Sequence, residues 1–376
     1  MSLPNLVRVA PGALVVGKPL PWTVFDSEGK VLLRQGYVIQ TESQLEQLFE
    51  RGLFEPRKRD RKEEPEAFDD SRARNPFTDY PTLLRTLETT LAAITSQEDS
   101  ALKRLLGLSR LVERICREAP DPCLALVHLY SVEPTAYEQT LFYAIICHFV
   151  ATEMGLDERR ISVLVAAALT ANIALLRFLD KLNASPRSLS EEQRNVIHLH
   201  PQRSVEALTK AGINNGLLLD IILQHHERSD GSGYPNGLAG VDILPEAQVL
   251  SYAEHYIAMI TRRAYRDRRS VSDAQKAILE QSRRDARPHI GKALLDALTP
   301  YPPGCLVRLA NNEVAVVTRR PVRLTGPFVQ AIIGAKGDRY PGSFQRDCSE
   351  LEFNIRAVEM PEIMPSMDFG LLWGFQ

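Results

Sequence analysis

Two adjacent histidines, His225 and His226, begin the segment HHERSDGSGYP, which has more chemically committed side chains in a short space than any other stretch of this chain. The residues before it, GLLLDIILQ, carry apolar side chains at helical spacing. Both histidines are therefore predicted to lie on the last turn of a buried helix and to face different directions. The glycines, tyrosine and proline that follow predict a tight turn. Because imidazole nitrogens bind first-row metals, one histidine can face a metal while the other faces a substrate or a second metal.

This segment, with the NGLAG that follows it, closely resembles the signature of the HD-GYP family, whose active members hydrolyse cyclic di-GMP at a two- or three-metal centre. Two further stretches are similar to family segments. LSEEQRNVIHLHP resembles the approach to the family's HP histidine, and SYAEHYIAMITRRAYR resembles its later metal-ligand helix. The resemblance covers about residues 135–285 and implies a helical bundle of the HD type.

Several positions of the resemblance lack the family's ligands. By position, the family's first histidine falls on Gln139, and its His-Asp pair falls on Ala171 and Asn172. Leu175 stands where the family has a substrate-contacting lysine. The family's aspartate resembles a ligand that bridges two metals, and a neutral asparagine amide is a poor substitute for it. The resemblance therefore implies a degenerate member that has lost most or all phosphodiesterase activity.

Four ligands survive at matching positions: His200, His225, His226 and Glu254, the last where an aspartate is usual. Three histidines and a carboxylate suffice for one first-row transition metal if they converge. The expected cofactor is one iron or manganese ion. The alternative is that these histidines are hydrogen-bonded in the core and hold no metal. Three further histidines match no ligand position and are expected to have surface or core roles: His148, His198 and His255.

A ligand with two phosphates can be held by guanidinium groups and tyrosine hydroxyls even where hydrolysis is impossible. Arg263, Tyr265 and Arg266, in the stretch RRAYR, are the candidate residues for binding cyclic di-GMP. The alternative is a solvated basic face at the end of a helix.

The same resemblance makes the loop after the histidines the expected contact surface for proteins that carry a GGDEF motif. This partner-binding loop consists of Glu227, Arg228, Asp230, Gly231, Gly233, Tyr234 and Pro235. The leading hypothesis is a degenerate HD-GYP protein, not an active enzyme, with a regulatory or scaffolding role in cyclic di-GMP signalling. Two alternatives stay open: an active phosphodiesterase with the reduced ligand set, and a metal-independent cyclic di-GMP sensor.

Composition excludes several other classes of protein. A net charge of -2 and 44% hydrophobic residues describe a soluble globular chain with no general attraction to nucleic acid or anionic lipid. No apolar run is long enough to span a membrane, and no segment resembles a signal peptide, so a cytoplasmic protein is expected.

The chain divides by composition into four parts. Residues 1–56 predict a small β-rich module, and residues 57–78 predict a charged linker. Residues 79–297 predict the helical domain, whose leading helices, 79–120, either pack on the core or pair with a second subunit in a homodimer. Residues 298–376 predict a small antiparallel β module and a tail. The expected fold class is mainly α, an HD-type bundle between two β modules.

Overall fold

The computed structural model describes the chain apart from residues 1–5, 10–13, 15, 21, 27–28, 51–53, 57–74, 177, 180–188, 264–265, 323–325, 362–366 and 376. Two compact units are present. One contains residues 1–73 together with 361–376, and the other contains residues 74–360. Among the described helices, none combines the length and the apolarity needed to cross a bilayer.

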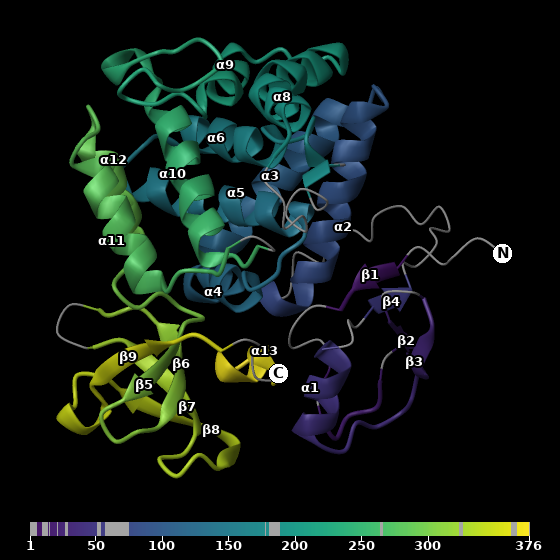
Figure 1. The fold of residues 1–376 in the computed structure, drawn as a ribbon, viewed down its shortest axis with the longest axis vertical. Coiled ribbons are helices and arrows are strands. Elements are labelled where there is room, and N and C mark those ends of the chain that lie inside the picture. Colours follow the sequence, from purple (N-terminus) through teal and green to yellow (C-terminus); the bar gives the residue numbers. More distant parts are fainter. Residues whose placement is uncertain are drawn as a thin grey trace. The chain divides into compact units, whose positions relative to one another are not determined.

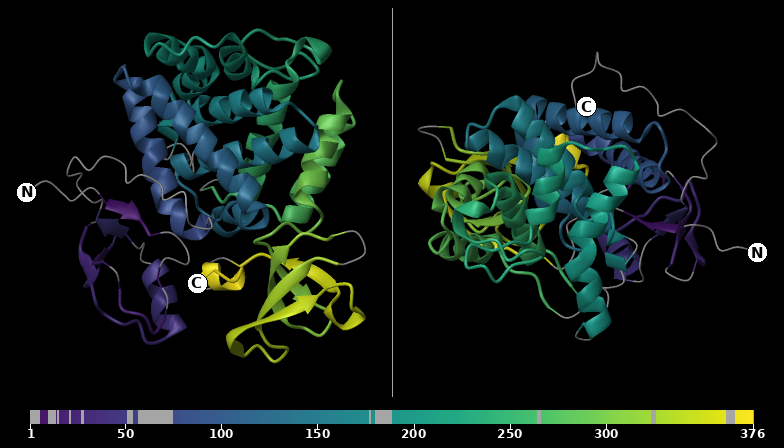
Figure 2. Two further views of the ribbon diagram at one scale, coloured as in Figure 1. Left: turned by 180° about the vertical axis from the view of Figure 1, so that it is seen from behind. Right: turned by 90° about the horizontal axis from the view of Figure 1, so that it is seen from above.

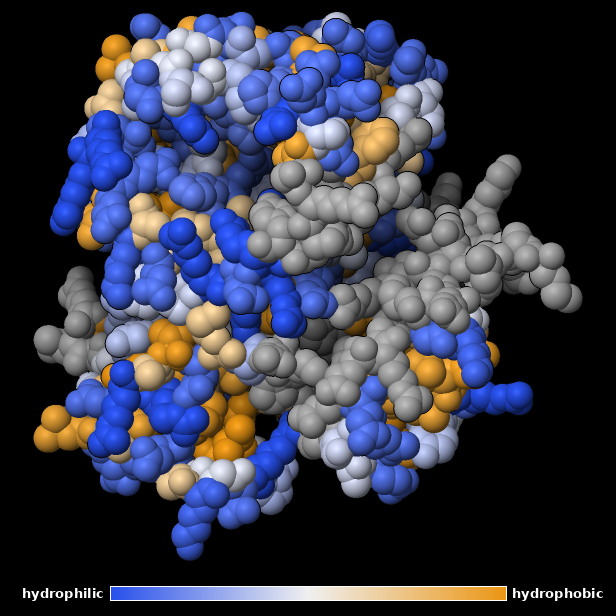
Figure 3. Space-filling view, viewed as in Figure 1, coloured by the Kyte–Doolittle hydropathy of each residue, from blue (hydrophilic) through white to orange (hydrophobic). Residues whose placement is uncertain are grey.

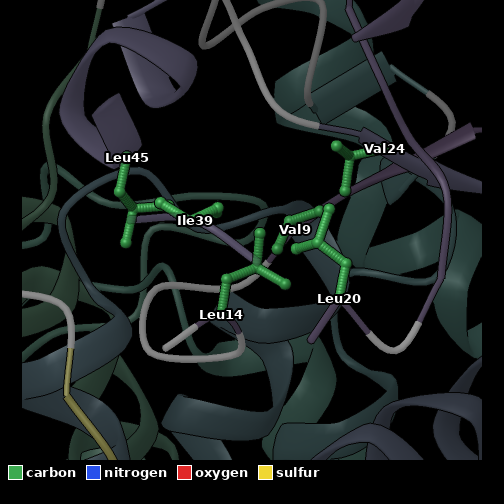
Figure 4. Close-up of a cluster of buried hydrophobic side chains, with 6 residues drawn as sticks. All are labelled: Val9, Leu14, Leu20, Val24, Ile39 and Leu45. Atoms are coloured by element: carbon green, nitrogen blue, oxygen red, sulfur yellow. The ribbon is translucent and has the colours of Figure 1, made fainter. Parts of the chain in front are cut away.

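The first unit is built on an antiparallel sheet with the strand order β1-β4-β2-β3. Its elements are β1 (Leu6–Arg8), β2 (Val24–Phe25), β3 (Val31–Leu33), α1 (Glu42–Glu50) and β4 (Phe54–Pro56). Buried aliphatic side chains from the strands, loops and α1 form its core (Figure 4): Val9, Leu14, Leu20, Val24, Ile39 and Leu45. This module is small and has the β-rich character that its turn signals predicted.

The C-terminal tail belongs to this first unit and not to the C-terminal β module in which it was expected. Its helix α13 (Phe369–Leu372) buries the side chains of Phe369 and Leu372. Beside it, the Lys18 ammonium lies 3.3 Å from the Asp368 carboxylate. The boundary was misplaced because local apolarity predicts that a tail packs, but not against which part of the chain.

Most of the predicted linker, residues 57–74, lies outside the described residues. Its last residues were assigned wrongly, since α2 begins at Pro76. The Asn75 side chain accepts a hydrogen bond from the Phe77 amide at 3.1 Å, and Pro76 has the fixed φ that suits a first helical turn. A good cap and a first-turn proline start the helix three residues earlier than composition indicated.

The second unit contains a helical domain (Figures 1 and 2). Its helices are α2 (Pro76–Thr95), α3 (Ala101–Glu118), α4 (Pro120–Tyr130), α5 (Ala136–Glu153), α6 (Glu158–Thr170), α8 (Glu191–Lys210), α9 (Gly216–Gln224), α10 (Pro245–Ile260), α11 (Val271–Ser282) and α12 (Pro288–Leu298). The central helix is α5, which contacts α2, α3, α4, α6, α10 and α12. It is apolar nearly all round, as a fully surrounded helix must be. On the face drawn in Figure 3, the described surface of this domain is largely hydrophilic.

A second antiparallel sheet follows the helices, with the strand order β8-β7-β6-β5-β9. Its strands are β5 (Leu306–Leu309), β6 (Val314–Arg319), β7 (Phe328–Ile333), β8 (Arg339–Asp347) and β9 (Ile355–Glu359). The Asn-Asn turn joins β5 to β6, and Asn312 has a positive φ of 72° there. The Arg320 guanidinium, at the end of β6, lies 2.6 Å from the Asp121 carboxylate of α4. The prediction of a mainly α fold with small β modules is confirmed.

The buried carboxylate of Glu313 gives this sheet a testable acid sensitivity. It accepts hydrogen bonds from the Tyr340 hydroxyl at 2.7 Å and from the Arg346 guanidinium at 3.0 Å. The Arg346 bonds are the main reason that the pKa of Glu313 falls from 4.5 to about 2. A lowered folded-state pKa stabilises the fold above the unfolded value, so this contribution is present above pH 4.5 and is lost as pH falls towards 2.

We expect Arg346→Met to destabilise the C-terminal sheet by about 2–4 kcal/mol at neutral pH, because it leaves a buried charge without its partner. The same change should flatten the dependence of stability on pH between 4.5 and 2. Urea unfolding at several pH values measures both effects. Arg356→Met, an exposed position on β9, is the control and should change neither. Equal pH dependence in wild type and Arg346→Met would contradict the assignment.

Candidate metal centre

Three imidazoles, one on a helix and two just after the end of another, converge at one point of the helical domain. His200 lies on α8, and His225 and His226 directly follow α9. One nitrogen from each ring lies within 4.8 Å of the other two. His200 and His225 are almost completely buried, at 1% and 0% exposure. Side chains that are distant in the chain therefore form one compact group of metal-binding donors.

His225 and His226 were predicted to lie on the last turn of the helix, but they are the first two residues after it. The helix ends at Gln224, and His225 is its C-cap residue. The His225 ring explains this ending, since its Nδ1 donates to the Ile222 carbonyl at 2.6 Å and satisfies one of the last helical carbonyls. The spacing of apolar residues predicted the helix, but it cannot predict where the helix ends, because the end depends on a hydrogen bond from the His225 side chain.

Hydrogen bonds to the backbone fix how two of the rings point. Nδ1 of His200 is 2.6 Å from the Ile197 carbonyl oxygen, in the same arrangement as His225 with Ile222. A carbonyl oxygen only accepts, so each Nδ1 carries the proton and each Nε2 presents a lone pair. These two Nε2 atoms lie 3.3 Å apart. Facing lone pairs repel one another, and a cation between them turns that repulsion into coordination.

The spacing of the donors suits a small cation. Donors bound at 2.0–2.1 Å to a tetrahedral centre stand about 3.3 Å from one another. The Nε2 atoms of His200 and His225 have this separation. Glu254, from α10, brings its Oε2 within 3.9 Å of His225 Nε2 and 3.8 Å of His226 Nε2. The three histidines therefore fit one small first-row divalent cation, and the Glu254 carboxylate lies close to two of them without belonging to their group.

The environment holds the three imidazoles in the form that binds metal. Burial lowers the pKa of His200 to about 3 and that of His225 to about 4, and it lowers the pKa of His226 as well. All three are neutral at physiological pH, as a metal ligand must be. Burial raises the pKa of Glu254 to about 7, against the opposing effects of Asn172 and Arg263. A bound cation would favour the ionised carboxylate.

Asn172 contacts the centre directly, just after α6. Its Nδ2 donates a hydrogen bond to Glu254 Oε1 at 2.5 Å. Since a carboxylate only accepts, the amide presents its NH₂ group to Glu254 and cannot offer that atom to a metal. Gln139, on α5, donates to the Pro134 carbonyl and accepts from the Tyr143 hydroxyl. Ala171 is buried in the apolar core. Its methyl group carries no donor atom.

A cavity of about 1120 Å³ adjoins the centre. His200, His226 and Glu254 line it, and so do Leu175 and Asn172. Of the arginines discussed, the cavity wall includes Arg228 and Arg263. The Arg266 guanidinium instead donates to the Ala258 carbonyl at 2.5 Å. Tyr265 lies outside the described residues. The cavity is large enough to hold a dinucleotide-sized ligand beside the metal donors.

Comparison with known proteins agrees with this architecture. Residues 102–287 match the family described as HD domain. A cyclic di-GMP phosphodiesterase of Pseudomonas aeruginosa is 27% identical over 218 residues, which cover 58% of this chain and 52% of that protein. A cyclic di-GMP phosphodiesterase response regulator of Xanthomonas campestris is 28% identical over 225 residues, which cover 57% and 58%. Residues 102–287 of this chain are an HD domain.

The chain spans about half the length of these curated relatives. Among solved structures, Bd1817, a HDG"Y"P protein from Bdellovibrio bacteriovorus, aligns with a TM-score of 0.45 at 16% identity, over 78% of this chain and 99% of that one.

One member of the expected partner-binding loop faces inward. Glu227 is 3% exposed, and its carboxylate accepts the backbone amides of Asn236 at 2.6 Å and Leu238 at 3.0 Å. The prediction that Glu227 belongs to the partner-binding surface is therefore wrong, because its carboxylate holds the loop together from inside. Arg228 and Asp230 are exposed. Within the turn, the Ser232 amide and hydroxyl both donate to Asp230.

The remaining loop residues shape the turn itself. Gly231 has a positive φ of 75°, a conformation that favours glycine. A Cβ at Gly233 would lie 2.4 Å from the Arg228 nitrogen, so a side chain is excluded there. Tyr234 and Pro235 are half-buried. The glycine pattern of the signature is thus a packing requirement of the loop.

Sequence reasoning missed the role of His198. It was expected to have an unspecialised surface or core position, yet its ring stacks on Tyr234 with centroids 4.4 Å apart and planes 6° from parallel. Nothing in the local pattern signals this contact, because Tyr234 arrives from a loop 36 residues later in the chain. Only the packing of that loop against α8 brings the two rings together.

Proposed function

We propose that this protein is a degenerate HD-GYP protein of cyclic di-GMP signalling, with phosphodiesterase activity lost or strongly reduced and a regulatory or scaffolding role in the cytoplasm. Its relatives are named cyclic di-GMP phosphodiesterases, which supports the ligand class. The observation that carries the loss of activity is the hydrogen bond from Asn172 to Glu254. An amide NH₂ group occupies the place where the family resemblance implies a carboxylate that bridges two metals.

Two-metal phosphodiester hydrolysis needs an anionic bridge to position and acidify the attacking water. Asn172 is neutral and donates to Glu254, which supports a centre that holds one cation instead of a bridged pair. Gln139, Ala171 and Leu175 stand where the resemblance implies two histidines and a lysine. A single bound metal would supply Lewis-acid polarisation of one phosphate, and the residues present would hold it without completing the second site.

The test is hydrolysis of cyclic di-GMP by the full chain, purified anaerobically and supplied with iron(II) or manganese(II), with His225→Ala as the blank. We expect wild-type turnover to be no greater than that of the blank. Turnover clearly above the blank would overturn the proposal in favour of an active phosphodiesterase that works with the reduced ligand set.

Cyclic di-GMP binding without hydrolysis is the second candidate function. It is favoured by the cavity beside the centre, whose wall includes the guanidinium-bearing residues Arg228 and Arg263. Tight binding of cyclic di-GMP by metal-free protein in calorimetry, together with no turnover, would make the protein a sensor. No affinity in that measurement would leave the scaffolding role.

The scaffolding role rests on the loop after the histidines. Arg228 and Asp230 are exposed on it, and Tyr234 and Pro235 are half-buried. These residues offer one cation, one anion and two apolar rings in a turn that Glu227 fixes from inside. Preorganised loops bind partners with a smaller entropy cost. A GGDEF-containing partner and a homodimer both remain predictions.

A further inference from the structure

The three imidazoles of the centre are not positioned in the same way. His200 and His225 each donate from Nδ1 to a backbone carbonyl at 2.6 Å. Such bonds normally orient metal-binding histidines. Within the described part of the chain, no corresponding hydrogen bond reaches the His226 ring, which is also the most exposed of the three, at 27% of its side chain. Something else must hold this ring.

The His226 ring contacts other rings in place of a backbone hydrogen bond: those of the two other donors, His225 at 4.0 Å and His200 at 4.9 Å, and that of Tyr234. The Tyr234 ring lies 4.8 Å from the His226 ring, with the planes tilted by 31°. The His198 ring lies 4.4 Å from the same Tyr234 ring, with the planes 6° from parallel. Two imidazoles this close to one phenol ring cannot share a face, so they flank it. His198, Tyr234 and His226 therefore form a continuous aromatic stack that ends at the centre.

The stack is tied to the rigid parts of the domain at both ends. His198 lies on α8, two residues before the donor His200. The Tyr234 amide donates to the His226 carbonyl at 3.2 Å, which fixes the backbone on which both rings are mounted. Tyr234 can still rotate or swing away unless a second group covers its outer face. His198 is the group that covers it.

We propose that His198 is a positioning residue for the metal centre: it clamps Tyr234 against His226 and so fixes the orientation of the one donor histidine that lacks a hydrogen bond to the backbone. This inference rests on the metal centre described above and on no catalytic activity. The ligand concerned is a first-row divalent cation. His198 itself acts through Tyr234 and does not touch the cation.

The experiment measures cobalt(II) binding by the full chain, because the visible absorption of cobalt(II) reports both affinity and coordination geometry. Three variants are compared with wild type. His198→Ala removes the ring, and His198→Phe keeps a ring that can stack. His289→Ala removes an exposed histidine at the start of α12 and is the matched control.

We expect His198→Ala to bind cobalt(II) about 10-fold more weakly, the lower end of the effect of groups that orient metal ligands, and to shift its absorption spectrum. The melting temperature of the metal-free protein should change little, because His198 is exposed. His198→Phe should stay within about threefold of wild type, since the stacking is retained. His289→Ala should match wild type.

Two results would overturn the positioning role alone. One is wild-type affinity and spectrum in His198→Ala. The other is a His198→Phe variant as weak as His198→Ala, which would mean that stacking is not the cause. A wild-type protein that takes up no cobalt(II) would overturn the metal centre and the clamp together. The proposed loss of hydrolysis is judged separately, by the turnover assay.

Discussion

Replacing His225 with alanine is expected to weaken metal binding by more than about 100-fold, because loss of a ligand costs more than loss of a group that merely orients one. His225 is fully buried, and its Nε2 lies 3.3 Å from His200 Nε2 and 3.9 Å from Glu254 Oε2. Metal content after purification without chelator, followed by manganese(II) titration, measures the change.

The buried histidine His148, on α5, provides the matched control. It is 4% exposed and is not part of the donor group. His148→Ala should keep wild-type metal content even if it lowers stability. A chelator should lower the melting temperature of wild type and leave that of His225→Ala unchanged, because a ligand stabilises only a fold that binds it. Full metal content in His225→Ala would show that His225 is not a ligand.

Replacing Gly233 with alanine is the second large effect expected. The added Cβ would lie 2.4 Å from the Arg228 nitrogen and 2.5 Å from the Glu227 Cα, both backbone atoms that cannot rotate away. The loop would have to move as a whole. That movement breaks the bond from the Tyr234 amide to the His226 carbonyl. We expect a loss of about 2–4 kcal/mol in stability and at least about 10-fold weaker metal binding.

Urea unfolding and cobalt(II) titration of Gly233→Ala test this expectation. Gly216→Ala is the control, because a Cβ at Gly216, the first residue of α9, meets nothing within 4 Å. That change should leave metal binding intact and shift stability by at most about 1 kcal/mol towards the folded state. Equal stability and metal binding in Gly233→Ala and Gly216→Ala would contradict this expectation, because they would show that the loop can move to admit a side chain at residue 233.

The order of the secondary structure could be predicted from the sequence because it depends on local patterns. Helical spacing of apolar residues predicted α2, α3 and α9, and the Pro-Pro-Gly and Asn-Asn turns predicted the start and first hairpin of the C-terminal sheet. The boundaries were less predictable. Asn75 starts α2 early through a side-chain cap, and the His225 ring ends α9 by taking the Ile222 carbonyl. Both depend on one hydrogen bond each.

The sequence by itself determined which donors this protein has: three histidines, a glutamate, and an asparagine where the HD-GYP resemblance implies an aspartate. Only the tertiary structure decided what these groups do to one another. His200 and His225 are 25 residues apart yet face each other at 3.3 Å, and Asn172 reaches Glu254 across 82 residues. The stacking of His198 on Tyr234 likewise joins two residues that are far apart in the sequence. Distances between side chains on separate elements depend on how those elements pack, and the periodicity of one segment carries no information about that packing.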